Sequence, residues 1–185
     1  MSGHSKWSQI KRQKGVTDAA KSRTFSRFAR LIAIESKKAN GNLSSPGLVT
    51  AIERAKAANM PKDNIERAVT KGNSKDASDL EQVVYEFYGP GGTALIVDAL
   101  TDNKNRTTQE IKHLMTKNGF ELGSPGSALW AFTKSLDGTL APNEPLMDLS
   151  ETDETALGAI LELFDDHEDV QQVYTNARGF ETTRE

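Results

Sequence analysis

Lysine and arginine are concentrated near the start of the chain, in a pattern suited to binding phosphate groups. Asp18 is the only acidic residue before position 35. A solvated helix face normally mixes both signs of charge, whereas cations that neutralise phosphates release condensed counterions and so favour binding. We therefore predict a nucleic-acid-binding surface here in preference to a merely solubilising one. Its candidate residues are Lys6, Lys11, Arg12, Lys14, Lys21, Arg23, Arg27, Arg30, Lys37 and Lys38.

Two other features carry weaker signals for nucleic acid. Trp7 lies among the cations, where its ring would either stack on an exposed base or pack against the helices. The polar loop at 101–107 offers four candidate contacts, Asn103, Lys104, Asn105 and Arg106. The same residue types are common in turns and helix caps, as are those of the glycine-rich turn at 89–92. From the sequence alone, a structural role is favoured over nucleic-acid binding for both segments.

No spacing of residues points to catalysis or to a metal. The run Asp165–Asp169 is acidic, but consecutive residues at a helix end point in different directions, so we expect a solvated acidic turn. The three histidines, at 4, 113 and 167, lack ligand spacing. The phosphate-loop, dinucleotide-binding and hydrolase motifs are missing, and the chain has no cysteine. We expect no enzyme activity, no cofactor and no metal.

Charge divides the chain into two parts. Residues 1–75 hold 16 Lys and Arg against 5 Asp and Glu, and residues 76–185 hold 7 against 21. The net charges of +11 and −14 account for the overall −3. Such asymmetry favours nucleic-acid binding by the basic part. No apolar run is long enough to span a bilayer, so we expect no membrane partner.

The basic part has the periodicity of short amphipathic helices. A helix is predicted from Thr17 or Asp18 to about Ala39, with Phe25, Phe28 and Ile32 on its apolar face. The stripe of arginines at 23, 27 and 30 falls on the opposite face. Two further helices are predicted from Pro46 and from near Pro61 to just before Gly72. These helices form a three-helix bundle.

The acidic part has the pattern of an α+β domain. Runs of β-branched and aromatic residues at 83–88 and 93–100 flank the hairpin signal Gly89–Gly92, and a helix is predicted over 106–118. Short strands are predicted at 120–122 and 128–133, followed by a loop through Pro142. Ser150 or Thr152 then caps a helix, and a strand at 170–175 ends the pattern. Helices covering one sheet face indicate a ferredoxin-like α+β fold.

These patterns predict four segments. Residues 1–16 form a mobile basic arm, and 17–75 form the helical domain. Residues 80–178 form the α+β domain, whose sheet is completed by the helix and strand within 152–176. Residues 179–185 form a tail.

Several segments resemble the YebC/PmpR family. They are Gly3–Trp7, Ala55–Ala68, Tyr88–Gly92, Thr101–Thr107 and Val170–Asn176. Because they occur in order over nearly the whole chain, the chain is identified as a member of that family. Members are longer, with a third domain inserted before the C-terminal helix and strand, and that domain is missing after Lys134.

The resemblance implies a non-catalytic regulator of gene expression in the cytoplasm, a DNA-binding transcription regulator of YebC type. One alternative is a ribosome-associated translation factor, a translational activator that relieves stalling and binds ribosomal RNA. Another is an adaptor whose acidic domain binds a basic protein surface. No helix has the side chains of a base-reading recognition helix, which favours backbone or shape recognition. We expect a monomer that binds DNA or ribosomal RNA.

Overall fold

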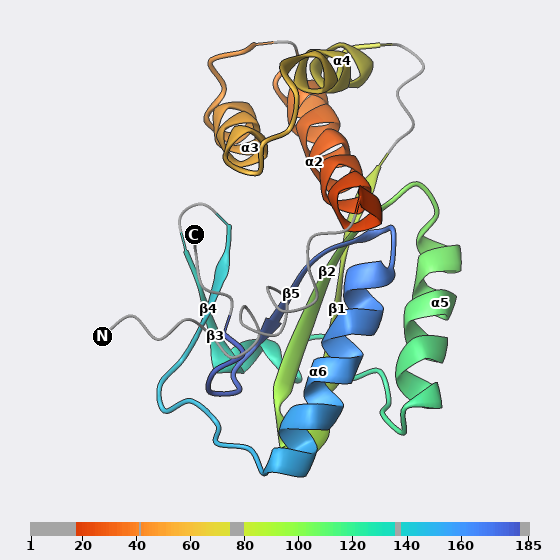
Figure 1. Ribbon diagram of the computed structural model, residues 1–185, viewed down its shortest axis with the longest axis vertical. Coiled ribbons are helices and arrows are strands. Elements are labelled where there is room, and N and C mark those ends of the chain that lie inside the picture. The colour runs from red at the N-terminus through yellow and green to blue at the C-terminus, as the bar shows by residue number, and fades with distance from the viewer. Residues whose placement is uncertain (1–17, 41, 75–79, 136–137, 182–185) are drawn as a thin grey trace. The chain divides into compact units, whose positions relative to one another are not determined.

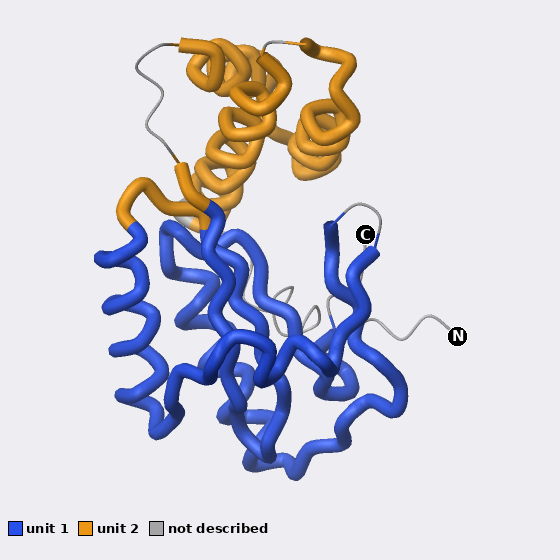
Figure 2. Tube along the Cα trace, turned by 180° about the vertical axis from the view of Figure 1, so that it is seen from behind, with its two compact units in different colours: residues 1–16, 82–99, 104–185 blue, residues 17–81, 100–103 orange. Residues whose placement is uncertain are grey.

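The computed structural model describes residues 18–40, 42–74, 80–135 and 138–181. The chain divides into two compact units (Figure 2). The helical unit contains residues 17–81 with 100–103, and the sheet unit contains 82–99 and 104–185.

Three helices form the helical unit: α2 (Asp18–Lys38), α3 (Pro46–Ala57) and α4 (Lys62–Gly72) (Figure 1). Their starts follow local chemistry, since Pro46 occupies the first turn of α3 and Pro61 immediately precedes α4. Ile32, Leu48 and Ile65, one from each helix, are buried together in a single apolar core. The predicted three-helix bundle is confirmed.

Helices α2 and α4 pack closely because a glycine lies at their contact. A Cβ atom on Gly72 would lie 2.2 Å from the carbonyl oxygen of Ala33, so only glycine allows this approach. The buried hydroxyl of Ser36 donates a 2.9 Å hydrogen bond to the carbonyl oxygen of Val69. These contacts fix the spacing of the two helices.

The sheet unit is built on three strands in the order β1 (Glu81–Tyr88), β2 (Ala94–Thr101) and β5 (Val170–Thr175). Strands β2 and β5 are antiparallel, with Leu95 opposite Thr175. Helices α5 (Lys104–Lys117) and α6 (Glu151–Asp166) cover one face of this sheet (Figure 1). In that core the rings of Phe87 and Phe164 lie 6.3 Å apart.

The opposite sheet face carries a smaller layer. Strands β3 (Phe132–Lys134) and β4 (Leu140–Pro142) pair antiparallel. They follow the short helix η2 (Leu129–Ala131), and a second core buries Ile96, Phe132 and Tyr174. The predicted α+β fold class is confirmed.

Most predicted elements are present within a few residues of their expected ends, and Ser150 caps α6 by accepting a bond from the Asp153 N–H. Three details are wrong. The segment 120–122 makes only an isolated bridge, Phe87 to Leu122, and the strand expected at 128–133 begins only at Phe132. Strand β4 occupies part of the segment through Pro142 for which the sequence predicts a loop.

The buried carboxylate of Glu86 explains the late start of β3. It accepts hydrogen bonds from the backbone N–H groups of Gly126, Ala128 and Leu129, at 2.6, 2.8 and 2.8 Å. These donors are therefore unavailable to a strand ladder, and the chain turns through η2 instead. Within the described ranges, no helix is long and apolar enough to cross a membrane.

Candidate nucleic-acid interface

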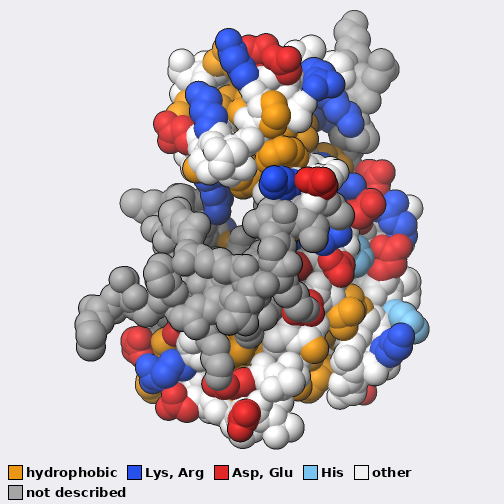
Figure 3. Space-filling model, in the orientation of Figure 1, with side chains coloured by type: hydrophobic (Ala, Val, Ile, Leu, Met, Phe, Trp, Pro, Cys, Tyr) orange, Lys and Arg blue, Asp and Glu red, His pale blue; other side chains and the backbone are white. Residues whose placement is uncertain are grey.

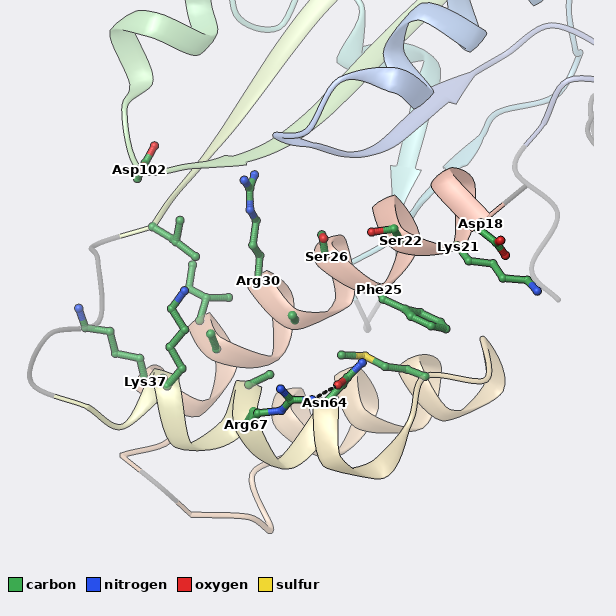
Figure 4. Close-up of a pocket in the computed structure, with 18 residues that line it drawn as sticks. Asp18, Lys21, Ser22, Phe25, Ser26, Arg30, Lys37, Asn64, Arg67 and Asp102 are labelled. Atoms are coloured by element: carbon green, nitrogen blue, oxygen red, sulfur yellow. Dashed lines mark hydrogen bonds between the residues drawn. The ribbon is translucent and has the colours of Figure 1, made fainter. Parts of the chain in front are cut away.

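A groove of about 840 Å³ runs between α2 and α4 in the helical unit (Figure 4). Its apolar lining includes Phe25, Ala29 and Ala33 of α2 and Ala68 of α4, with Met60 from the preceding loop. These side chains adjoin the packed core of the bundle. The groove is therefore formed by the helix packing, and the closely approaching Gly72 and Ala33 both line it.

Cationic side chains from both helices line this groove. Lys21, Arg30 and Lys37 come from α2, and Arg67 and Lys71 come from α4. Asp18 and Asp102 also line it, so the positive charge is in excess but not exclusive. Two rows of cations over an apolar floor suit a phosphate backbone, with ribose or base surfaces resting between them.

Arg67 is oriented by its own helix. Its Nε donates a 3.2 Å bond to the carbonyl oxygen of Asp63, and its Nη2 donates to the side-chain oxygen of Asn64. Figure 4 shows this pair on the α4 side of the groove. A guanidinium held in this way loses less conformational freedom when it binds an anion.

The structure describes six of the predicted cations, which fall into three groups. Lys21, Arg30 and Lys37 line the groove, whereas the half-buried Arg23 and Arg27 do not. Lys38 lies 2.7 Å from the carboxylate of Glu35. The other predicted contacts, Lys6, Trp7, Lys11, Arg12 and Lys14, lie outside the described residues.

The sequence alone does not single out Arg67 and Lys71 as contacts. Their spacing of four residues puts them on one face of α4. That spacing was a usable signal, but nothing local indicated that α4 would pack beside α2 with this face turned to the groove.

The four loop residues predicted as candidate contacts, at 103–106, do not line the groove. Asn103, Lys104 and Asn105 are exposed where α5 begins. Arg106 donates a 2.9 Å bond to the carboxylate of Asp169, which also accepts a 2.7 Å bond from the Thr107 hydroxyl. Arg106 is thus a partner of a buried acid, which supports a role of this loop in the fold over a role in nucleic-acid binding.

Asp169 is 3% exposed, so the expected solvated acidic turn is wrong for this residue. Ligand atoms of Glu110, His167 and Asp169 all lie within 4.8 Å of one another. However, Nδ1 of His167 accepts the Asp169 N–H at 3.2 Å, which leaves the ring proton on Nε2, 3.2 Å from Glu110. A metal at Nε2 would displace that proton and meet the Arg106 guanidinium, so this cluster fits a structural role.

Charge on the surface follows the division seen in the sequence. On the face shown in Figure 3, Lys and Arg side chains lie beside exposed apolar side chains on the helical unit, together with some Asp and Glu side chains. Asp and Glu side chains are spread over the sheet unit in the same view.

Comparison with known proteins decides the family. Residues 5–75 match the TACO1/YebC protein N-terminal domain, and residues 80–136 match the TACO1/YebC second and third domain. The chain belongs to the TACO1/YebC family. The sequence-based family assignment is confirmed.

Relatives and a solved structure agree with this assignment. The chain is 43% identical over 178 residues to a "Probable transcriptional regulatory protein" of Thermotoga petrophila, a match covering 95% of this chain and 70% of the relative. One of the same name from Desulfatibacillum aliphaticivorans is 42% identical over 187 residues, covering 100% and 75%. The crystal structure of the conserved hypothetical protein Aq1575 from Aquifex aeolicus matches with a TM-score of 0.75 and 28% identity, covering 87% of this chain and 91% of that one.

This family member matches about 70 to 75% of the length of the two curated relatives, which are longer. Five residues, 135–139, join β3 to β4, and the Ser135 N–H donates a 2.8 Å bond to the Thr139 carbonyl oxygen. No domain is therefore inserted at this point of the chain. The relatives' names describe regulators of transcription.

Proposed function

We propose that this chain is a nucleic-acid-binding regulator of gene expression that holds a phosphate backbone in the α2/α4 groove. The observation that supports this most is the alignment of five cations from two helices along one groove, Lys21, Arg30, Lys37, Arg67 and Lys71. The names of the relatives support a role in transcription. The acidic part repels bulk nucleic acid, so binding is oriented by the helical unit.

The groove favours backbone recognition over base reading. Its cations are Lys and Arg in two rows, and a duplex held in this way is selected by shape and deformability more than by base edges. Duplex DNA and ribosomal RNA share the backbone chemistry that the groove recognises. A competition experiment between duplex DNA and ribosomal RNA is therefore needed to identify the physiological target.

The first test removes three groove cations together, Arg30→Ala, Arg67→Ala and Lys71→Ala. We expect weaker duplex binding and a salt dependence that is shallower by about 0.9 log units for each phosphate that is no longer neutralised. The measurement is fluorescence anisotropy with labelled duplex DNA at several salt concentrations.

A matched control removes the same charge elsewhere on the helical unit. Arg54, Lys56 and Lys62 are exposed and lie outside the groove lining, so their triple alanine variant should keep the wild-type slope. Equal reductions in both triple variants would contradict a groove-centred site. A reduction confined to an Arg23→Ala, Arg27→Ala variant would place binding on the other face of α2.

A second experiment separates the two targets. Purified ribosomes and duplex DNA compete for labelled protein at physiological salt. Ribosome binding that excess DNA does not displace would support the translation-factor alternative and overturn a DNA-directed role, whereas retention on a particular duplex would support transcriptional control.

A further inference from the structure

An exposed apolar patch lies on the sheet face opposite α5 and α6. Trp130 is 68% exposed, the highest value among the large hydrophobic side chains that the structure describes. Val84 and Tyr88 project from the same face of β1, and Leu129 adjoins Trp130 in η2. We call these four residues, Val84, Tyr88, Leu129 and Trp130, the aromatic patch; all are exposed.

Hydrogen bonds fix the two rings of the aromatic patch. The indole Nε1 of Trp130 donates to the hydroxyl of Tyr88 at 3.0 Å and to the carbonyl oxygen of Ser127 at 2.9 Å. The Tyr88 hydroxyl itself donates to that carbonyl oxygen. The polar atoms of both rings are thus hydrogen-bonded within the protein, and much of the ring surface is exposed to solvent.

The backbone beneath the rings is also held. Glu86, which lies between Val84 and Tyr88 along β1, binds the N–H of Leu129 through its carboxylate. Asn143 donates a 3.0 Å bond to the carbonyl oxygen of Trp130. Because the rings of Trp130 and Tyr88 are exposed, they bury little apolar surface and contribute little to the stability of the fold. A fixed Trp–Tyr pair is instead typical of the preorganised anchors that dominate binding energy at protein interfaces.

Charge around the patch indicates the chemistry of its partner. The bridge between Phe87 and Leu122 places the exposed Glu121 opposite Tyr88. At the other end, Gln82 donates to the carboxylate of Asp98, whose charge is offset by Lys134, so Glu121 is the acid that a partner of the patch would meet. The patch itself contains no cation, and residues 76–185 hold 7 basic against 21 acidic residues. A phosphate backbone is therefore disfavoured here, and basic groups are favoured.

We propose that the aromatic patch is a docking site for a protein segment that presents an apolar side chain flanked by Lys or Arg. The apolar side chain packs on Trp130 and Tyr88, and the flanking cation faces Glu121. This site is separate from the α2/α4 groove, so the two can be tested independently.

The test selects peptides from a library of random 12-residue sequences displayed on phage, using the full chain as bait. We expect enrichment of peptides that combine apolar residues with Lys or Arg. A synthetic copy of a selected peptide should lose about tenfold or more of its affinity for Trp130→Ala. It should lose less for Trp130→Phe, and it should bind Leu163→Ala, a matched exposed apolar residue on α6, as it binds wild type.

Fluorescence gives an independent readout. The chain has two tryptophans, so a Trp7→Phe background leaves Trp130 as the sole reporter. A blue shift that saturates with the selected peptide, and weakens in Glu121→Lys, supports the proposal.

Three outcomes would overturn it. The first is a failure to enrich peptides, or enrichment without a basic bias. The second is quenching of Trp130 by a thymidine oligonucleotide but not by an abasic strand of equal length, which would assign the patch to nucleobases. The third is a concentration-dependent dimer that Trp130→Ala abolishes, which would assign it to a second copy of this chain.

Discussion

At the scale of single residues, Glu86 connects distant parts of the sheet unit. Burial raises the pKa of its carboxyl group, but hydrogen bonds from the N–H groups of Gly126, Ala128 and Leu129 outweigh that effect, and the net pKa is lowered. One buried charge on β1 therefore positions the turn that carries the exposed tryptophan.

Replacing Glu86→Gln should destabilise the sheet unit by about 1 to 3 kcal/mol, because a neutral amide accepts these bonds more weakly and adds an unpaired N–H₂. Urea unfolding at neutral pH measures this change. Glu121→Gln is the matched control, since an exposed site should change by about 0.5 kcal/mol at most.

The same substitution predicts a pH dependence. Because the folded pKa of Glu86 is lowered, its contribution is fully present above the unfolded pKa and is lost as pH falls through the folded pKa. The difference in unfolding free energy between wild type and Glu86→Gln should therefore shrink on acidification. A difference that stays constant down to pH values below the folded pKa would show that the carboxylate charge is not the cause.

At the scale of elements, the α2–α4 contact determines the groove. Gly72→Ala would bring a Cβ atom to 2.2 Å from the Ala33 carbonyl oxygen and 2.8 Å from the Ser36 Cβ. We expect a loss of about 1 to 3 kcal/mol in stability and weaker duplex binding, because the helices must separate.

The matched control for that change is Gly158→Ala in α6, where a new Cβ would meet nothing within 4 Å. There alanine should stabilise the protein by about 0.5 to 1 kcal/mol through its higher helix propensity. Thermal unfolding of both variants gives the comparison, and equal effects at the two positions would mean that the close approach at Gly72 is unimportant.

Elements set by local chemistry were predictable, and those set by distant contacts were not. Pro46 and Ser150 lie at the starts of α3 and α6 and predict those starts from local sequence. The absence of a strand at Ala128 depends on Glu86, more than forty residues earlier in the sequence. Likewise the basic stripe on α2 was visible, whereas the share of Arg67 in the groove depends on how α4 packs.

At the scale of the whole molecule, opposite charges on the two parts of the chain should restrict how nucleic acid approaches. Asp166 and Glu168 are exposed acids near the end of α6. Reversing the charge at both positions, with Asp166→Lys and Glu168→Lys, should strengthen duplex binding at low salt. Neutralising it, with Asp166→Asn and Glu168→Gln, should give an affinity between those of wild type and the reversed variant.

These differences should disappear at about 1 M salt, where the screening length falls to about 3 Å. Anisotropy titrations of the three proteins measure the series. Unchanged affinity at low salt would show that the acidic part does not influence the approach of the duplex.

The short connection between β3 and β4 has a consequence for protein engineering. Lys134 and Leu140 are paired in an antiparallel ladder, so the chain leaves and re-enters the fold at neighbouring points. A guest protein whose own termini lie close together, such as a fluorescent reporter, can be inserted between them without interrupting the two apolar cores of the sheet unit. The hairpin thus offers a place to label the molecule internally while leaving the groove and the aromatic patch intact.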